Sequence, residues 1–148
     1  MQNHSKILLI LLITLNICNN SYSQKYTEKY IKDASKVAEI WLNNMDNYNF
    51  DLTYKMMDNQ VKDIYDSLAW YGYFNDLVSE FGKKEKKRKI LSREFKSKID
   101  EIGNGFFVEI NYEAFFQKTK NFKETILLKQ NDNSEWKVIG YQPIWDNK

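Results

Sequence analysis

Apolar residues recur at helical spacing through the first half of the chain, from Tyr26 to Gly82. When the residues after Lys29 are projected down a helix axis at about 100° per residue, most of their apolar side chains fall within one arc of roughly 140°. The polar side chains fall outside this arc. The members of this arc are Tyr30, Ile31, Ala34, Val37, Ala38, Trp41, Leu42 and Met45. The spacing predicts an amphipathic helix that packs one face against a core and ends in the Asn- and Asp-rich stretch 43–49.

Further helical segments are expected before the middle of the chain. A short turn is predicted around Tyr54, and helical spacing resumes near Gln60. The longest of these pieces runs from Leu68 to Phe81. It should stop at Gly82, because glycine adopts the left-handed conformation that ends many helices without steric cost.

Beyond Lys86 the spacing changes to the alternation that is typical of strands. Phe106, Val108, Ile110, Tyr112, Ala114 and Phe116 are predicted to face inward. Phe107 and Phe115 are predicted to face outward. Further strands are expected at 123–129 and 136–141, with turns at 102–105, 117–121 and 130–134.

The order of these elements indicates the fold class. Helices at about 26–82 are followed by strands at about 86–143, and this order is typical of an α+β domain. We expect the N-terminal helices to pack on one face of a curved four-stranded antiparallel sheet.

The first 23 residues have the layout of a secretory signal peptide. Lys6 precedes an apolar run from Ile7, and the small residues Ser21 and Ser23 occupy the third and first positions before a cleavage point after Ser23. The run is shorter than the roughly 20 residues that a membrane-spanning helix needs. Residues 24–148 are therefore expected to form a single exported domain, periplasmic or secreted. The alternative is a lipoprotein anchored at Cys18, although Ile17 is larger than the residue that normally precedes a lipidated cysteine.

Cleavage after Ser23 would remove the only cysteine, Cys18, and the only histidine, His4. These two residue types most often bind transition metals or act as nucleophiles and bases near neutral pH. We therefore expect no metal or cofactor, and any catalysis would depend on carboxylates, lysines and tyrosines. The cut also removes Lys6, which lowers the net charge from +2 to +1. So small a charge makes a nucleic acid an unexpected partner.

Several segments together resemble a known family. They are the run 37–42, Asp46, the helical stretch that contains Trp70, and the run 136–141. The chain is similar over about 35–144 to the uncharacterised bacterial domain-of-unknown-function family 4019. That family resembles the nuclear transport factor 2-like, cystatin-like domains, which are cone-shaped α+β folds. The resemblance implies an aromatic pocket between helices and sheet, with Tyr54, Trp70, Tyr73, Tyr112 and Tyr141 as candidate lining residues.

The densest charge run contains six basic residues within seven positions: Lys83, Lys84, Lys86, Lys87, Arg88 and Lys89. Such a run could dock on an anionic surface such as phospholipid headgroups. The alternative interpretation is a solvated connection between the last helix and the first strand.

The sequence favours an exported, non-enzymatic accessory module that binds a small apolar ligand or an envelope protein. The alternative is an enzyme like the isomerases and dehydratases of the wider superfamily, with a carboxylate and tyrosines in the cone. A filled interior would favour the binding module, and an open cavity with an inward carboxylate would favour the enzyme. A homodimer that pairs through the sheet face, using Phe107 and Phe115, is a third hypothesis.

Overall fold

The computed structural model describes the backbone of residues 2–148 and the side chains of residues 24–148. The helices α1 (Gln2–Asp46), α2 (Phe50–Lys55), α3 (Asn59–Lys62) and α4 (Ser67–Phe81) precede the strands β1 (Lys89–Ile99), β2 (Gly103–Glu113), β3 (Thr119–Gln130) and β4 (Trp136–Asn147). The strands form one sheet in the order β1-β2-β3-β4, and each pair is antiparallel. The predicted α+β fold is confirmed.

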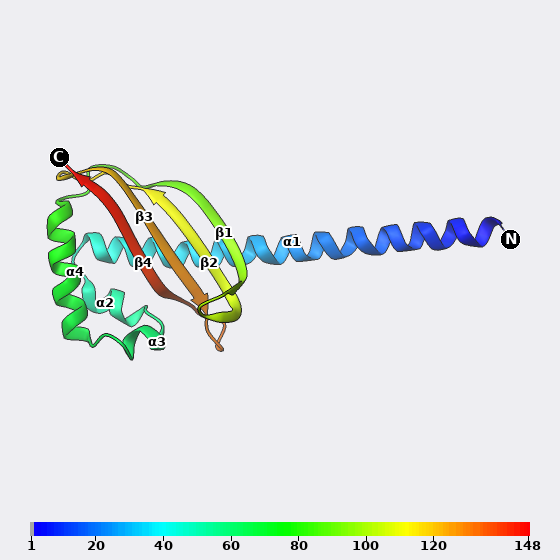
Figure 1. The fold of residues 1–148 in the computed structure, drawn as a ribbon, viewed down its shortest axis with the longest axis horizontal. Coiled ribbons are helices and arrows are strands. Elements are labelled where there is room, and N and C mark those ends of the chain that lie inside the picture. The colour runs from blue at the N-terminus through cyan, green and yellow to red at the C-terminus, as the bar shows by residue number, and fades with distance from the viewer. Residues whose placement is uncertain (1) are drawn as a thin grey trace.

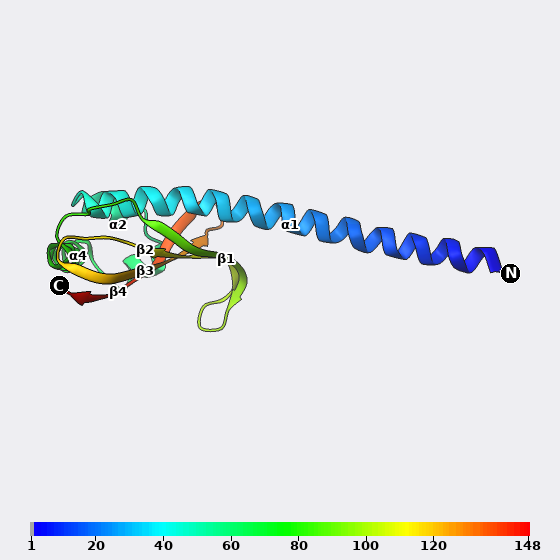
Figure 2. The same cartoon turned by 90° about the horizontal axis from the view of Figure 1, so that it is seen from above.

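The helices take different positions around the curved sheet (Figure 1). α1 crosses one face of the strands and extends well beyond them toward the N-terminus, whereas α4 stands at one end of the sheet. Seen from above, α1 lies on one side of the sheet and the tip of the β1–β2 hairpin bends away on the other (Figure 2). The core therefore forms between α1, α4 and the inner face of the sheet.

The predicted apolar arc of α1 is the face that packs on the sheet. Ala34, Ala38, Trp41, Leu42 and Met45 are buried, and the other members are partly buried. α1 ends at Asp46, as the spacing predicts, but it begins at Gln2 rather than near Tyr26. The earlier start has a simple reason, because no glycine or proline interrupts residues 2–46.

Side-chain caps begin α3 and α4, and a hydrogen bond to β4 fixes the link between α2 and α3. Asp58 accepts the Gln60 N–H at the start of α3, and Asp66 accepts the Ala69 N–H at the start of α4. The link between α2 and α3 also pairs with β4, since the Asp58 N–H donates to the Val138 carbonyl at 3.0 Å. α4 stops at Phe81, and the residue that follows, Gly82, has a φ of 74°, which agrees with the predicted stop.

The strand alternation holds over most of β2 but fails at its start. Val108, Ile110, Tyr112, Ala114 and Phe116 are buried as predicted.

Phe106 faces α1 as expected, since its ring lies 5.0 Å from that of Tyr30, yet it is 44% exposed where α1 leaves the sheet. The prediction that Phe107 is an exposed outward residue is wrong, because its exposure is 0%. The pairing of β1 with β2 shifts between Lys96 and Lys98, and Gly105 lies so close that an added Cβ would be 3.0 Å from the Phe107 ring. The hairpin backbone thus covers Phe107.

The outer face of the sheet is polar around its centre. Lys96 pairs with Glu109 at 2.8 Å, and Thr125 donates a hydrogen bond to Asn111 at 2.6 Å. Glu109 points away from the core, as the alternation predicts. With Phe107 covered and Phe115 half-buried, the homodimer hypothesis loses one of the two phenylalanines on which it depends.

Candidate functional site

An aromatic groove of about 560 Å³ lies between α3, α4 and β4. Its aromatic walls are Tyr65, Trp70, Tyr73, Phe74 and Tyr141, and Met57, Val61 and Ile139 add aliphatic surface. We call this the aromatic groove. It brings together three of the five residues predicted to line a pocket, namely Trp70, Tyr73 and Tyr141.

The other two predicted pocket residues lie outside the aromatic groove. Tyr54 stands behind it, with its ring 6.2 Å from that of Trp70, and its hydroxyl donates to the Tyr65 carbonyl at 3.0 Å. Tyr112 is buried on β2 and lines a separate cleft beside Glu39 on α1.

Trp70 is held rigidly in the wall of the aromatic groove. Its indole N–H donates to the Thr53 hydroxyl at 3.0 Å, and that hydroxyl donates to the Phe50 carbonyl at 2.8 Å. The Trp70 ring also lies 4.1 Å from that of Phe74. Tyr73, one turn along α4, is 61% exposed. The aromatic groove therefore has a fixed inner wall and one accessible rim.

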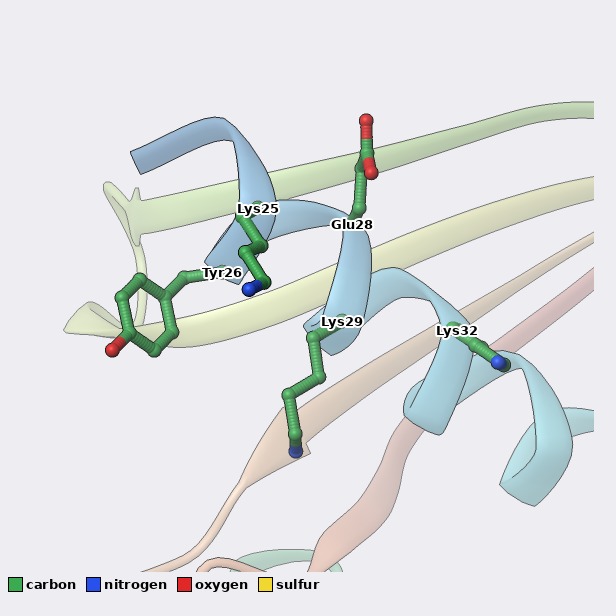
Figure 3. Close-up of a pocket in the computed structure, with 5 residues that line it drawn as sticks. All are labelled: Lys25, Tyr26, Glu28, Lys29 and Lys32. Atoms are coloured by element: carbon green, nitrogen blue, oxygen red, sulfur yellow. The ribbon is translucent and has the colours of Figure 1, made fainter. Parts of the chain in front are cut away.

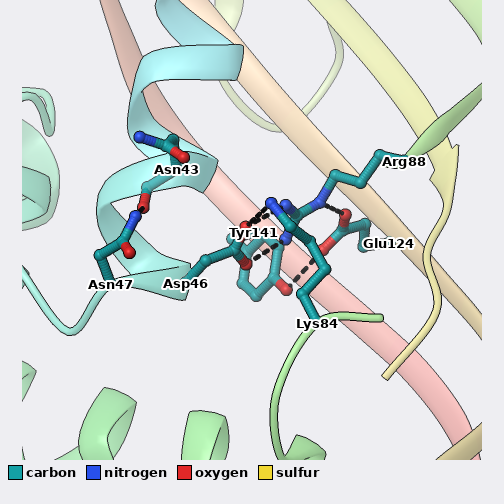
Figure 4. Close-up of polar contacts among 7 residues, drawn as sticks. All are labelled: Asn43, Asp46, Asn47, Lys84, Arg88, Glu124 and Tyr141. Atoms are coloured by element: carbon teal, nitrogen blue, oxygen red, sulfur yellow. Dashed lines mark hydrogen bonds and ion pairs between the residues drawn. The ribbon is translucent and has the colours of Figure 1, made fainter. Parts of the chain in front are cut away.

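A buried charge cluster lies beneath the aromatic groove, and Tyr141 belongs to both (Figure 4). The Tyr141 hydroxyl donates to Oε2 of Glu124 at 2.8 Å, while Oε1 of Glu124 accepts from Nε of Arg88. The two terminal nitrogens of Arg88 bind the two oxygens of Asp46 at 2.6 and 2.8 Å. Lys84 reaches the same carboxylate from the loop that follows α4.

The members of this cluster are withdrawn from water. Glu124 is 1% exposed, and the side chains of Arg88 and Asp46 are 10% and 8% exposed. Burial opposes the charge of Arg88, but hydrogen bonds to Asp46 and the charge of Glu124 outweigh it and raise the pKa of the guanidinium. Burial, together with the negative charge of Glu124, raises the pKa of Tyr141 well above its ordinary value. Tyr141 therefore stays a neutral donor at physiological pH.

Glu124 is not among the site residues predicted from the sequence, although its place in β3 indicates its role. Phe122, Ile126 and Leu128 are the buried residues that alternate along β3, and Glu124 occupies the same inward face. An acidic residue within an inward-facing alternation predicts a buried, paired carboxylate. Its partners, Asp46 and Arg88, are distant in the sequence and could not be identified in this way.

The basic run does not form a continuous exposed patch. The prediction that Arg88 belongs to a surface patch is wrong, because it is buried between carboxylates. Lys84 pairs with Asp46, and Lys89 lies 3.7 Å from Glu113. The Lys86 ammonium lies 5.5 Å from the centre of the Phe115 ring. Within the part of the chain whose side chains are described, Lys83 and Lys87 make no ion pair.

A hollow of about 410 Å³ on α1 is lined by Lys25, Tyr26, Glu28, Lys29 and Lys32, whose side chains project in different directions along the helix (Figure 3). Over residues 24–148, no group of three or more Asp, Glu, His or Cys side chains is placed so that it could hold a metal ion. In the same described region, no helix combines the length and apolarity needed to cross a membrane.

Comparison with known families gives one match. Residues 37–141 match the family described as "Protein of unknown function (DUF4019)". No curated protein matches the chain.

Proposed function

Because the chain belongs to the DUF4019 family, whose function is unknown, we propose a role from its own geometry. It is an exported accessory module that binds a small, flat, apolar ligand in the aromatic groove and does not transform it. The observation that carries this proposal is the combination of aromatic walls with a charge cluster whose groups are already bound to one another.

The aromatic groove has the features of a small-molecule site. Its volume of about 560 Å³ lies within the usual range of roughly 300–1,000 Å³. The buried rings of Trp70 and Phe74 form its inner wall, and the exposed ring of Tyr73 stands beside them. Aromatic faces favour offset or edge contacts with another ring. A neutral, planar aromatic ligand would therefore fit this groove better than a charged ligand would.

The charge cluster supports binding rather than catalysis. A general base needs a lone pair that can reach the substrate and a pKa near the working pH. Both oxygens of Glu124 are engaged, one by Arg88 and the other by Tyr141. The inner wall is filled by the rings of Trp41, Trp70 and Phe74, which lie against one another.

The proposal includes export, with cleavage after Ser23. Among the described side chains the first buried one is Ala34, and Tyr30 is the first that packs against the core. A cut before Gln24 would therefore leave the core contacts of residues 24–148 in place. The intact mass of the protein recovered from its host tests this: a chain starting at Gln24 is expected, and a diacylglyceryl-Cys18 start would establish the anchored alternative.

Ligand binding can be tested by calorimetric titration with 1-naphthol, a neutral flat probe. We expect saturable binding that Tyr73→Ala weakens severalfold and Val61→Glu abolishes, because the latter places a charge among apolar walls. Leu68→Ala is the matched control, since Leu68 is 80% exposed on the same helix and does not line the groove. Equal affinities of the wild type and Val61→Glu would contradict the proposal.

The enzyme alternative is favoured by one observation, the contact of Tyr141 with both the groove and the buried Glu124. In that case the Tyr141 hydroxyl would leave Glu124 to polarise a substrate carbonyl, and the freed Oε2 of Glu124 would take a proton from the α-carbon and return it to the γ-carbon. A β,γ-unsaturated cyclic ketone would thus become its conjugated isomer, and Tyr141→Phe would lose that activity. The relationship to nuclear transport factor 2-like domains stays part of the proposal, supported by helices on one face of a curved sheet.

A further inference from the structure

A second cleft, of about 320 Å³, lies between α1 and the segment that leads into β1. We call it the lysine cleft. Leu42, Ile90 and the ring of Tyr112 give it an apolar part, and Lys84 and Lys87 give it a basic part. It shares no lining residue with the aromatic groove.

Tyr112, which lines the lysine cleft, has an unpaired buried hydroxyl. Tyr112 is 2% exposed, and its hydroxyl has no hydrogen-bond partner among the described residues. The only other buried side-chain polar atom of which this is true, over residues 24–148, is the hydroxyl of Thr119. Buried polar groups are nearly always paired, because an unpaired one has lost its water without compensation. The Tyr112 hydroxyl is therefore a donor that lacks an acceptor.

The charges that line the lysine cleft indicate what that acceptor could be. Lys84, Lys87 and Arg88 line the cleft, against a single carboxylate, Glu39. Three N–H groups of Arg88 are bound to Asp46 and Glu124, whereas Lys87 has no ion pair in the described region. Lys84 gives one hydrogen bond to Asp46 and retains further N–H groups.

Further charges act on the phenol from neighbouring elements. Arg93 and Arg88 favour its ionised form, whereas burial, Glu39 and Glu124 oppose it and raise the pKa of Tyr112 to about 12. The hydroxyl thus keeps its proton at neutral pH, and that proton needs an acceptor.

We propose that the lysine cleft binds the carboxylate of a short monocarboxylic acid, whose oxygen accepts from the Tyr112 hydroxyl. The ammonium groups of Lys84 and Lys87 neutralise the carboxylate, and Leu42 and Ile90 contact the apolar body. The Tyr112 hydroxyl is closed to water in this structure. We therefore expect the ligand to enter by displacing the side chains that cover this hydroxyl. This site does not depend on the function proposed for the aromatic groove.

The probe for the lysine cleft is benzoate, titrated calorimetrically into the full domain. We expect saturable binding at millimolar concentration or below. Tyr112→Phe should weaken it about tenfold, as expected for loss of one hydrogen bond to a charged group. Lys87→Gln should also weaken it, whereas Lys83→Gln, outside the cleft, should leave it unchanged. Benzamide, which has the same ring without the charge, should bind at least tenfold more weakly.

The folding of the Tyr112 variant provides a second measurement. Because Tyr112→Phe removes an unpaired hydroxyl, its urea midpoint should equal or exceed that of the wild type. Glu39→Gln should strengthen benzoate binding, since it removes a like charge. The proposal is overturned if the wild type does not bind benzoate saturably, or if Tyr112→Phe and Lys87→Gln bind it as well as the wild type does.

Discussion

The hydroxyl of Tyr141 donates to Oε2 of Glu124 at 2.8 Å, and this bond connects the wall of the aromatic groove to a buried ion pair. Glu124 thus has one oxygen bound to a tyrosine and the other to Arg88. Ion pairs that are buried are costly to break from one side, because the remaining partner keeps its charge without compensation. The cluster is therefore expected to hold the fold together.

Removing the carboxylate of Glu124 should destabilise the domain strongly. Glu124→Ala is expected to cost about 3–5 kcal/mol in the free energy of unfolding, because it leaves Arg88 half-paired inside the core. Glu109→Ala is the matched control, since Glu109 pairs with Lys96 on the outer face and is 28% exposed. That change should cost no more than about 1 kcal/mol. Urea denaturation distinguishes the two, and similar losses would mean that the cluster is not structural.

The hydroxyl of Thr53 should matter more than its methyl group. Thr53→Val leaves the indole N–H of Trp70 buried without an acceptor and is expected to cost about 1–3 kcal/mol. Thr53→Ser retains the hydroxyl, so it should recover most of this loss. The measurement is the urea midpoint of both variants. If serine and valine were equally damaging, the hydrogen bond would not be responsible.

Stability should decrease in alkaline solution because of Tyr112. Burial, with the charges of Glu39 and Glu124, raises the pKa of Tyr112 to about 12, from about 10 in an unfolded chain. The folded state holds this proton more tightly, so the stabilisation is complete below about pH 10 and is lost as the pH rises to about 12.

The free energy of unfolding should therefore decrease less steeply above about pH 10 in Tyr112→Phe than in the wild type. Tyr73→Phe, at an exposed position, serves as the control and should follow the wild type. Identical slopes for all three proteins would contradict the assignment.

The basic run should bind anionic membranes far better as a peptide than in the folded domain. In the domain Arg88 is buried, and Lys84 and Lys89 have acidic partners. Each free basic residue contributes about 1 kcal/mol near an anionic surface. Co-sedimentation with phosphatidylserine vesicles should therefore retain a peptide of residues 83–89 and release the domain. Retention of the domain that Lys83→Glu abolishes would restore the docking hypothesis.

The periodicities of the sequence predict most of the fold. The apolar arc of α1 from Tyr30 to Met45, the stop at Gly82 and the strand order agree with the structure, because each depends on local spacing. Phe107 could not be placed in this way. Its burial depends on a register shift and on the approach of Gly105, which are properties of two strands together.

The candidate site was predictable only in part. Trp70, Tyr73 and Tyr141 meet in the aromatic groove, but aromatic residues alone do not reveal which of them share a wall. Arg88 looked exposed because its neighbours in the sequence are lysines. Its carboxylate partners, Asp46 and Glu124, come from the end of α1 and from β3, and only the folded chain brings the three together.

The central claim is that the aromatic groove is a ligand site, and amide chemical-shift mapping of residues 24–148 with 1-naphthol tests it most directly. We expect the largest shifts at Ile139, Gly140 and Tyr141 on β4 and around Trp70 and Tyr73 on α4, all of which lie at the groove. Amides of the outer sheet face, such as Thr125, should not move. Shifts centred on that face, or no saturable shifts at the groove, would contradict the account.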